Sequence, residues 1–184
     1  MRARPPEIAR RVESAIGALI GADRLRRPAA HEALAAELIA EPQRAGELAE
    51  IVAKCESDSI TIAPLGAGRT LAQLRASPVA LGVSLRRMAR IIAYEPEDMT
   101  VVAEAGLTLG ALNDHMAARR QHLPLDPPDP PSITLGALIG AAKSGPLRLM
   151  EGTPRDLLIG IRFAGHGGRI VHGGGAVVKN VAGY

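Results

Sequence analysis

A proline-rich segment constrains the fold of this chain more than any other part of the sequence. Five prolines lie within the eight residues 124–131. Proline fixes φ near −65° and has no amide hydrogen, so it interrupts helices and the inner strands of sheets. We therefore expect residues 122–131 to form an ordered, extended connector.

Helical periodicity dominates the sequence before residue 58. Apolar residues recur at spacings of four, four and three within Pro5–Ile20, which predicts a helix there. A second helix is predicted over His31–Ala40, which is rich in Ala, Leu and Glu and ends before Pro42. A third helix follows, and Cys55 completes its apolar face, so we interpret this cysteine as a packed core thiol.

After Asp58 the pattern changes to short β-like runs. They are Ile60–Ala63, Val79–Val83, Ile91–Tyr94 and Thr100–Ala103. Helical spacing returns over Leu107–Arg119, and the runs Leu157–Ala164 and Arg169–His172 flank a four-residue turn, which predicts a β-hairpin. This order of elements indicates an α+β protein rather than a regular doubly wound sheet.

Composition narrows the class of protein further. Of the 184 residues one is cysteine, which excludes an internal disulfide and a cysteine-based metal site and fits a reducing compartment. No apolar run reaches the roughly 18–20 residues of a membrane helix, so we expect a soluble, cytoplasmic chain. The basic residues cluster near the start of the chain. With three aromatic residues in all, the sequence gives no support to nucleic acid as a partner.

A turn of small residues follows the predicted strand Ile60–Ala63. It contains Gly66, Ala67, Gly68, Arg69 and Thr70. Backbone N–H groups in such a turn point into one concavity, which suits a phosphate or pyrophosphate. A Rossmann fingerprint needs glycine where Leu71 stands, and a Walker loop needs Gly-Lys-Ser/Thr, so neither fits. A plain tight turn remains an alternative interpretation.

A second run of small residues follows the prolines, from Ser132 to Ser144-Gly145-Pro146. Arg155-Asp156 comes next, and residues 178–184 read Val-Lys-Asn-Val-Ala-Gly-Tyr. With the motifs at 64–70, 94–106 and 123–136 in this order, the chain resembles the FAD-binding domain of the vanillyl-alcohol oxidase/p-cresol methylhydroxylase type. Within that type it is most similar to the FAD-binding subunits of glycolate oxidase. The resemblance covers roughly residues 41–184.

The resemblance implies a two-lobed FAD-binding domain over residues 41–184, truncated at its C-terminal end, after a helical N-terminal extension over residues 1–40. It implies that the loop Gly66–Thr70 binds the pyrophosphate and that Val181 lies against the adenosine or ribityl part of the cofactor. The residues that would line the cofactor are Pro128, Ser132, Leu135, Gly136, Ala137, Ser144 and Gly145. The first loop has no histidine, so we expect FAD to be bound non-covalently.

The function implied by the resemblance is oxidation of a 2-hydroxy acid such as glycolate, by hydride transfer to FAD. The implied partners are further subunits, including an iron–sulfur electron-transfer subunit. The implied location is the cytoplasm, where such partners could hold the protein at the surface of the inner membrane. No catalytic residue is assigned. The sequence shows no paired carboxylates, nucleophile–base pair or metal cluster of persuasive spacing.

Three positions depart from the family pattern. Ala67 and Ala137 stand where the family usually has glycine, and Ala142 stands where the hydroxy-acid branch has asparagine. Each alanine at 67 and 137 adds a methyl group beside the expected path of the cofactor, which would weaken FAD binding. An alternative hypothesis is therefore a structural or assembly subunit with weak or lost FAD binding. A nicotinamide-dependent Rossmann enzyme is a third hypothesis.

Two further sets of polar residues have simpler interpretations. Asp126 and Asp129 lie among the prolines, where aspartate commonly forms turns. For Arg155-Asp156 the sequence leaves two interpretations open, a structural ion pair and a contact with the cofactor.

Overall fold

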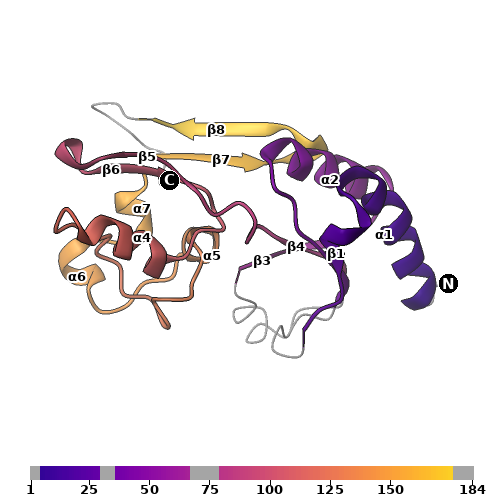
Figure 1. Ribbon diagram of the computed structural model, residues 1–184, viewed down its shortest axis with the longest axis horizontal. Coiled ribbons are helices and arrows are strands. Elements are labelled where there is room, and N and C mark those ends of the chain that lie inside the picture. The colour runs from indigo at the N-terminus through magenta and orange to yellow at the C-terminus, as the bar shows by residue number, and fades with distance from the viewer. Residues whose placement is uncertain (1–4, 30–35, 67–78, 176–184) are drawn as a thin grey trace. The chain divides into compact units, whose positions relative to one another are not determined.

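The computed structural model describes residues 5–29, 36–66 and 79–175 (Figure 1). The chain divides into two compact units. Unit 1 is Met1–Arg87 with Phe163–Val171, and unit 2 is Met88–Arg162 with His172–Tyr184. Among the described helices none is long and apolar enough to span a membrane.

Unit 1 is a four-stranded sheet covered by two helices. Its elements are α1 (Pro5–Ile20), the 3₁₀ turn η1 (Ala22–Arg24), β1 (Leu25–Arg26), β2 (Ala36–Ala40), α2 (Ala45–Ser57), β3 (Ile62–Leu65) and β4 (Val79–Ser84). The strand order is β1-β2-β4-β3, in which β1 is antiparallel to β2 and the other three strands are parallel. The predicted first and third helices are confirmed, as are the strand at 79–83 and, shifted by two residues, the strand at 60–63.

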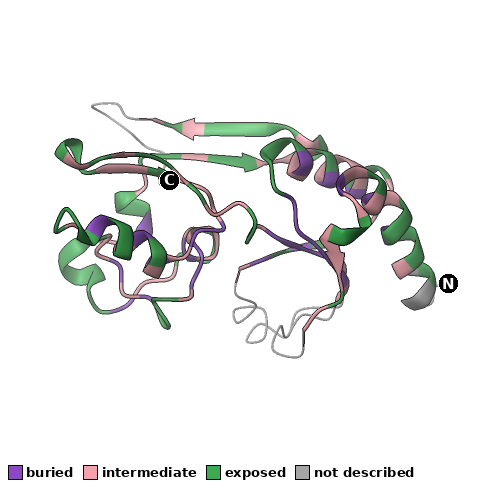
Figure 2. Ribbon diagram, viewed as in Figure 1, coloured by how far each residue is buried: buried purple, intermediate pink, exposed green. Residues whose placement is uncertain are grey.

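The core of unit 1 explains why these helices form. Val12, Ile16 and Ile20 make the buried stripe of α1, and Ile51 and Cys55 make that of α2. Both stripes pack on the sheet residues Leu38, Ala40, Leu81 and Val83. Purple stretches on α1, α2 and the central strands mark this core in Figure 2. Cys55 is 1% exposed within this core, which confirms a core thiol. Burial, with a smaller contribution from Asp58, raises the pKa of this thiol to about 11.

The predicted helix over His31–Ala40 is wrong where the structure describes it, because Ala36–Ala40 is strand β2. Leu38 and Ala40 face the two helices, whereas Ile39 belongs to a cluster with Ala63 and Leu65. An inner strand buried on both faces loses the alternating pattern, and tertiary packing overrides the helix propensity of Ala, Leu and Glu. The predicted boundary between residues 40 and 41 lies within unit 1, directly after this strand.

Unit 2 combines a small antiparallel sheet with short helices. Its elements are β5 (Ile91–Glu95), the 3₁₀ turn η2 (Pro96–Asp98), β6 (Thr100–Ala103), α4 (Leu109–Ala117), α5 (Leu135–Gly140), α6 (Arg148–Glu151) and α7 (Pro154–Leu157). The buried residues Leu107, Leu112 and Met116 pack with the inner side chains of β5 and β6. The two strands and the helix predicted in this region are confirmed, the helix over a shorter range.

The predicted hairpin is also confirmed. β7 (Gly160–Ala164) and β8 (Ile170–Gly174) pair on either side of the 3₁₀ turn η3 (His166–Gly168). The turn packs on α2. There the Glu56 carboxylate accepts a hydrogen bond from the Gly167 N–H at 2.5 Å and pairs with the His166 ring.

A buried carboxylate ties the start of α2 to the neighbouring turn. Glu47 accepts hydrogen bonds from Arg24 Nη1 at 2.6 Å, Gln43 N at 2.8 Å and Arg44 Nη2 at 2.9 Å. The Arg24 hydrogen bond is the main cause that lowers the pKa of Glu47 to about 2, against the opposing effect of burial. The charged form of Glu47 therefore stabilises the folded state.

We predict that Glu47 makes the stability of unit 1 depend on acid pH. Because its pKa is lowered on folding, its contribution is present above pH 4.5, the ordinary value, and is lost as the pH falls toward about 2. A shift of this size corresponds to at most about 3–4 kcal/mol. Urea denaturation at several pH values should show a weaker pH dependence for Glu47→Gln, whereas Glu50→Gln, an exposed neighbour on α2, should behave like the wild type. Equal slopes for the wild type and Glu47→Gln would contradict the prediction.

Candidate functional site

The second small-residue loop is positioned by two threonines. Thr108 and Thr134 face each other in an antiparallel bridge. Each is the N-cap of a helix, Thr108 of α4 and Thr134 of α5, and each side-chain oxygen accepts a hydrogen bond from the backbone three residues on. On either side of the bridge, Leu109 N donates to Ile133 O at 2.9 Å and Leu135 N donates to Leu107 O at 2.8 Å.

The first amide groups of α5 are all used within the protein. After Leu135, Gly136 N donates to Ala105 O at 2.8 Å and Ala137 N donates to Thr134 Oγ1 at 3.3 Å. A Cβ at Gly136 would lie 3.1 Å from the Ala105 carbonyl oxygen, so this glycine permits a close approach of two backbone segments. The start of α5 therefore shapes a wall and offers no amide donors to an anion.

Asp126 holds the proline-rich segment against the Ser144-Gly145-Pro146 turn. Its two carboxylate oxygens accept hydrogen bonds from Gly145 N and Leu147 N, each at 3.1 Å. A Cβ at Gly145 would lie within 2.5 Å of this carboxylate, so the contact requires glycine. The sequence interpretation of Asp126 as a turn former missed this bridge, since no local pattern links residues 19 positions apart.

Asp129 is the turn former that the sequence predicted. It has a φ of +59°, and its carboxylate accepts a hydrogen bond from the Ser132 hydroxyl. Aspartate tolerates this left-handed conformation better than most residues.

The structure gathers one of the two predicted groups of cofactor residues. The seven residues predicted to line the cofactor belong to unit 2: Pro128, Ser132, Leu135, Gly136, Ala137, Ser144 and Gly145. Pro128 is exposed, Gly145 is buried and the other five are intermediate. Of the pyrophosphate loop, Gly66 follows β3 in unit 1, while Ala67, Gly68, Arg69, Thr70 and also Val181 lie outside the described residues.

Two of the departures from the family pattern have different structural consequences. Ala137 has no positive φ, lies in the first turn of α5 and packs on a core cluster with Leu109 and Leu138. Ala142 has a φ of +46°, and the bonds Ala142 N to Ile139 O and Lys143 N to Leu138 O end α5 in a Schellman motif. The backbone conformation of Ala137 is therefore unstrained, whereas that of Ala142 is strained because its Cβ disfavours a positive φ.

Asp156 has a role that neither interpretation of Arg155-Asp156 included. Its carboxylate accepts hydrogen bonds from Thr153 N and Thr153 Oγ1, both at 2.7 Å, which forms a capping box at the start of α7. The backbone hydrogen bond is the first cause that lowers the pKa of Asp156. Asp156 therefore stabilises the local turn.

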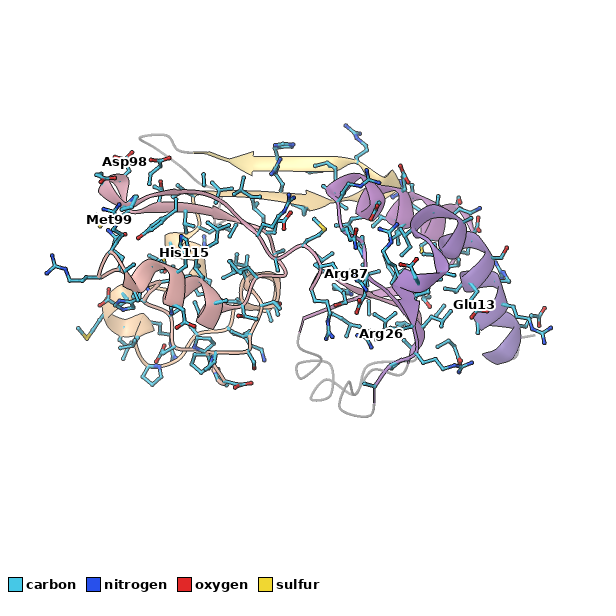
Figure 3. All side chains as sticks on the ribbon, viewed as in Figure 1. Glu13, Arg26, Arg87, Asp98, Met99 and His115 are labelled. Atoms are coloured by element: carbon cyan, nitrogen blue, oxygen red, sulfur yellow. The ribbon has the colours of Figure 1, made fainter. Side chains whose placement is uncertain are left out.

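In unit 1 a cluster of charged side chains lies around Glu41, at the carboxyl edge of the parallel strands. Glu41, directly after β2, is 6% exposed, and its carboxylate lies 2.8 Å from Arg26 Nε, 3.0 Å from Arg87 Nε and 3.7 Å from Arg86 Nε. Burial raises the pKa of Glu41, but hydrogen bonds from Arg26 and Arg87 outweigh it and leave the pKa lowered. Figure 3 labels Arg26 and Arg87 beside the sheet.

The same edge also holds Gly66 and a buried hydroxyl. Ser84 ends β4 and is in register with Leu65, the residue before Gly66. Ser84 Oγ is buried and has no hydrogen-bond partner among the described residues. Ligands of α/β sheets bind at the carboxyl ends of parallel strands. A glycine, an unpaired hydroxyl and several guanidinium groups fit a phosphate-containing cofactor at this edge.

Comparison with known proteins identifies the cofactor. The family model described as FAD binding domain matches residues 36–174, well over half of the chain. The chain belongs to this FAD-binding family. FAD is its cofactor, and the start of the match at residue 36 coincides with the start of β2.

The curated relatives include subunits of glycolate oxidase and a D-lactate dehydrogenase, and each is several times longer than the match. Glycolate oxidase subunit GlcE of Escherichia coli K12 is 33% identical over 95 residues, which is 51% of this chain and 27% of the relative. D-lactate dehydrogenase [cytochrome], mitochondrial, of Arabidopsis thaliana is 28% identical over 151 residues (80% and 26%). Glycolate oxidase subunit GlcD of Bacillus subtilis is 30% identical over 149 residues (78% and 31%). The chain thus spans less than a third of each relative.

Solved structures confirm the fold. p-Cresol methylhydroxylase with substrate bound has a TM-score of 0.70 at 16% identity, over 91% of this chain and 36% of the other. Phl p 4.0202, a glucose dehydrogenase, has a TM-score of 0.74 at 13% identity, over 88% and 37%. The predicted α+β domain of the p-cresol methylhydroxylase type is therefore correct.

We predict that Gly145→Ala destabilises the protein by about 2 kcal/mol or more, because the new methyl group would lie 2.2 Å from the Asp126 carbonyl oxygen and 2.5 Å from its carboxylate. The control is Gly140→Ala in α5, where a Cβ meets nothing within 4 Å. Urea denaturation should leave that variant within about 1 kcal/mol of the wild type. Equal stability of the two variants would contradict the role of Asp126.

We also predict that Ala142→Gly stabilises the protein by about 0.5–1 kcal/mol, because glycine adopts the left-handed conformation without strain. Ala142→Asn should give a smaller gain. Ala141→Gly is the matched control, since Ala141 has a φ of −104°, and it should destabilise. Thermal melts of the three variants compare these effects, and a loss of stability in Ala142→Gly would refute the prediction.

Proposed function

We propose that this chain is the FAD-binding part of an oxidoreductase that oxidises a 2-hydroxy acid such as glycolate. The family match supplies FAD, and the relatives GlcE, GlcD and D-lactate dehydrogenase carry the names of two 2-hydroxy acids, glycolate and D-lactate. In both acids the oxidised carbon bears a hydroxyl group beside a carboxylate. FAD, when bound, accepts the hydride from such a carbon.

Each unit, taken by itself, offers a ligand a different kind of contact. In unit 2, the Thr108–Thr134 bridge and Asp126 hold the second loop in one conformation before any ligand arrives. Since the amides at the start of α5 are already paired, this loop offers a ligand shape and apolar contact. In unit 1, Ser84 and Arg87 offer a hydroxyl group and a guanidinium group at the carboxyl edge of the sheet.

The conformation of Ala137 supports retained FAD binding. A methyl group that packs on a core cluster at an unstrained position gives no reason for lost affinity. Two departures from the family pattern, Ala67 and Ala137, led to the alternative hypothesis of a structural subunit without useful FAD affinity. Local packing accounts for Ala137. Ala67, the other, lies outside the described residues.

We further propose that the protein works with partner subunits, one of them an iron–sulfur electron-transfer subunit, in the cytoplasm or at the inner membrane surface. The support is that GlcE and GlcD are each named as subunits of glycolate oxidase. Electrons that reach FAD must leave it for an acceptor, and a subunit with a one-electron centre provides such a route.

The test uses the natural protein that contains this chain. We expect the purified protein to bind FAD, and glycolate or D-lactate to bleach the visible flavin absorbance without oxygen. Ethylene glycol, which lacks the carboxylate, should not. Bound FAD that no 2-hydroxy acid reduces would refute the proposed substrate class. Absence of FAD binding would favour the structural-subunit alternative, and Ala67→Gly together with Ala137→Gly should then restore it.

A further inference from the structure

The hydroxyl of Ser84 is the starting observation. Ser84 is 1% exposed, and its oxygen is the one buried side-chain polar atom among the described residues that has no hydrogen-bond partner. Burying a hydroxyl without a partner is destabilising, and nearly all buried polar groups in native proteins are paired. A group from outside the chain that accepts a hydrogen bond here would remove the penalty.

The position of Ser84 indicates which way the hydroxyl faces. Successive side chains of a strand point to opposite faces of the sheet, and Val83 packs with α1 and α2. Ser84 therefore lies on the opposite face, at the end of β4. It is in register with Leu65, so the hydroxyl is next to the point where the chain leaves β3 at Gly66.

The neighbouring strand end gathers guanidinium groups around one carboxylate. Ala40 is in register with Val83, which places Glu41 level with Ser84. Three guanidinium groups, those of Arg26, Arg86 and Arg87, lie within 4.0 Å of the single Glu41 carboxylate.

The cations at this edge are more accessible than the anion. The side chain of Glu41 is 8% exposed, whereas those of Arg86 and Arg87 are 47% and 41% exposed. The buried carboxylate of Glu41 thus holds the guanidinium groups in place, and the parts of Arg86 and Arg87 that do not contact it reach solvent. A hydroxyl donor beside fixed arginines is a set of groups that recognises phosphate.

We propose that Ser84 Oγ donates a hydrogen bond to a pyrophosphate oxygen of FAD and that Arg87, held by Glu41, supplies positive charge to the same group. The proposal rests on FAD binding by this family, and it assigns two cofactor contacts to the end of β4 and the residues directly after it. It requires no contribution from the flavin ring, so its test measures binding and not substrate oxidation.

The decisive variant is Ser84→Ala. We expect the Kd for FAD to rise about tenfold, which corresponds to about 1.4 kcal/mol. The Kd for ADP should rise by a similar factor, and that for riboflavin, which has no phosphate, should stay unchanged. The melting temperature of the ligand-free protein should rise, because the unpaired buried hydroxyl is gone. Ser14→Ala, at an exposed site on α1, is the control and should alter none of these values.

Arg87→Gln tests the charge without touching the sheet interior. Arg26 and Arg86 still lie beside Glu41 in this variant. We expect FAD and ADP to bind several-fold more weakly and with a smaller dependence on salt than in the wild type. The control is Arg11→Gln, which removes the same charge from α1, where Arg11 donates to the Asp58 carbonyl.

Three results would overturn the proposal. One is unchanged affinity for FAD and ADP in Ser84→Ala and Arg87→Gln, and another is an equal loss for riboflavin. The third is a lower melting temperature of ligand-free Ser84→Ala, which would show that the hydroxyl is satisfied inside the protein. A wild type that binds FAD but oxidises no 2-hydroxy acid would refute the proposed substrate and leave this inference standing. A wild type that binds neither FAD nor ADP would refute both.

Discussion

A segment with five prolines in eight residues has few amide donors of its own, so other groups must hold it in place. The Asp126 carboxylate does this, since it accepts hydrogen bonds from two backbone amides of the Ser144–Leu147 turn. The second loop of unit 2 depends on this bridge. With it, the loop is ordered by contacts within the protein and presents a preformed wall of small residues.

Unit 1 uses buried carboxylates in a related way. Glu47 anchors the start of α2, and Glu41 gathers three arginines at the carboxyl edge of the parallel strands. A buried carboxylate stays charged only when it is paired, and both carboxylates have a lowered pKa because arginines surround them. At Glu41 the cluster that satisfies a buried charge also holds Arg87 at the carboxyl edge, where 41% of its side chain is exposed.

Local patterns predicted the elements that bury one face. Hydrophobic periodicity predicted the apolar stripe of α1 and the helix over 45–57. Turn chemistry predicted the hairpin of β7 and β8 and the loop at the proline segment. Strand β2 was missed because Leu38, Ile39 and Ala40 are all buried, which leaves no alternation to read. Asp126 was seen but misread, since its partners lie 19 and 21 residues further on.

The sequence by itself determined the family, because small-residue loops, a proline segment and their order along the chain are recognisable without coordinates. It also determined which residues to expect beside the cofactor, including Gly136 and Gly145. Tertiary structure decided what those residues do: Gly145 makes room for a carboxylate, and Ala137 packs on a core cluster without strain. It also revealed Ser84 and the arginines around Glu41, whose meaning depends on neighbours in space. Hydrogen bonds and charges act over a few ångströms, and the fold alone sets which distant residues come that close.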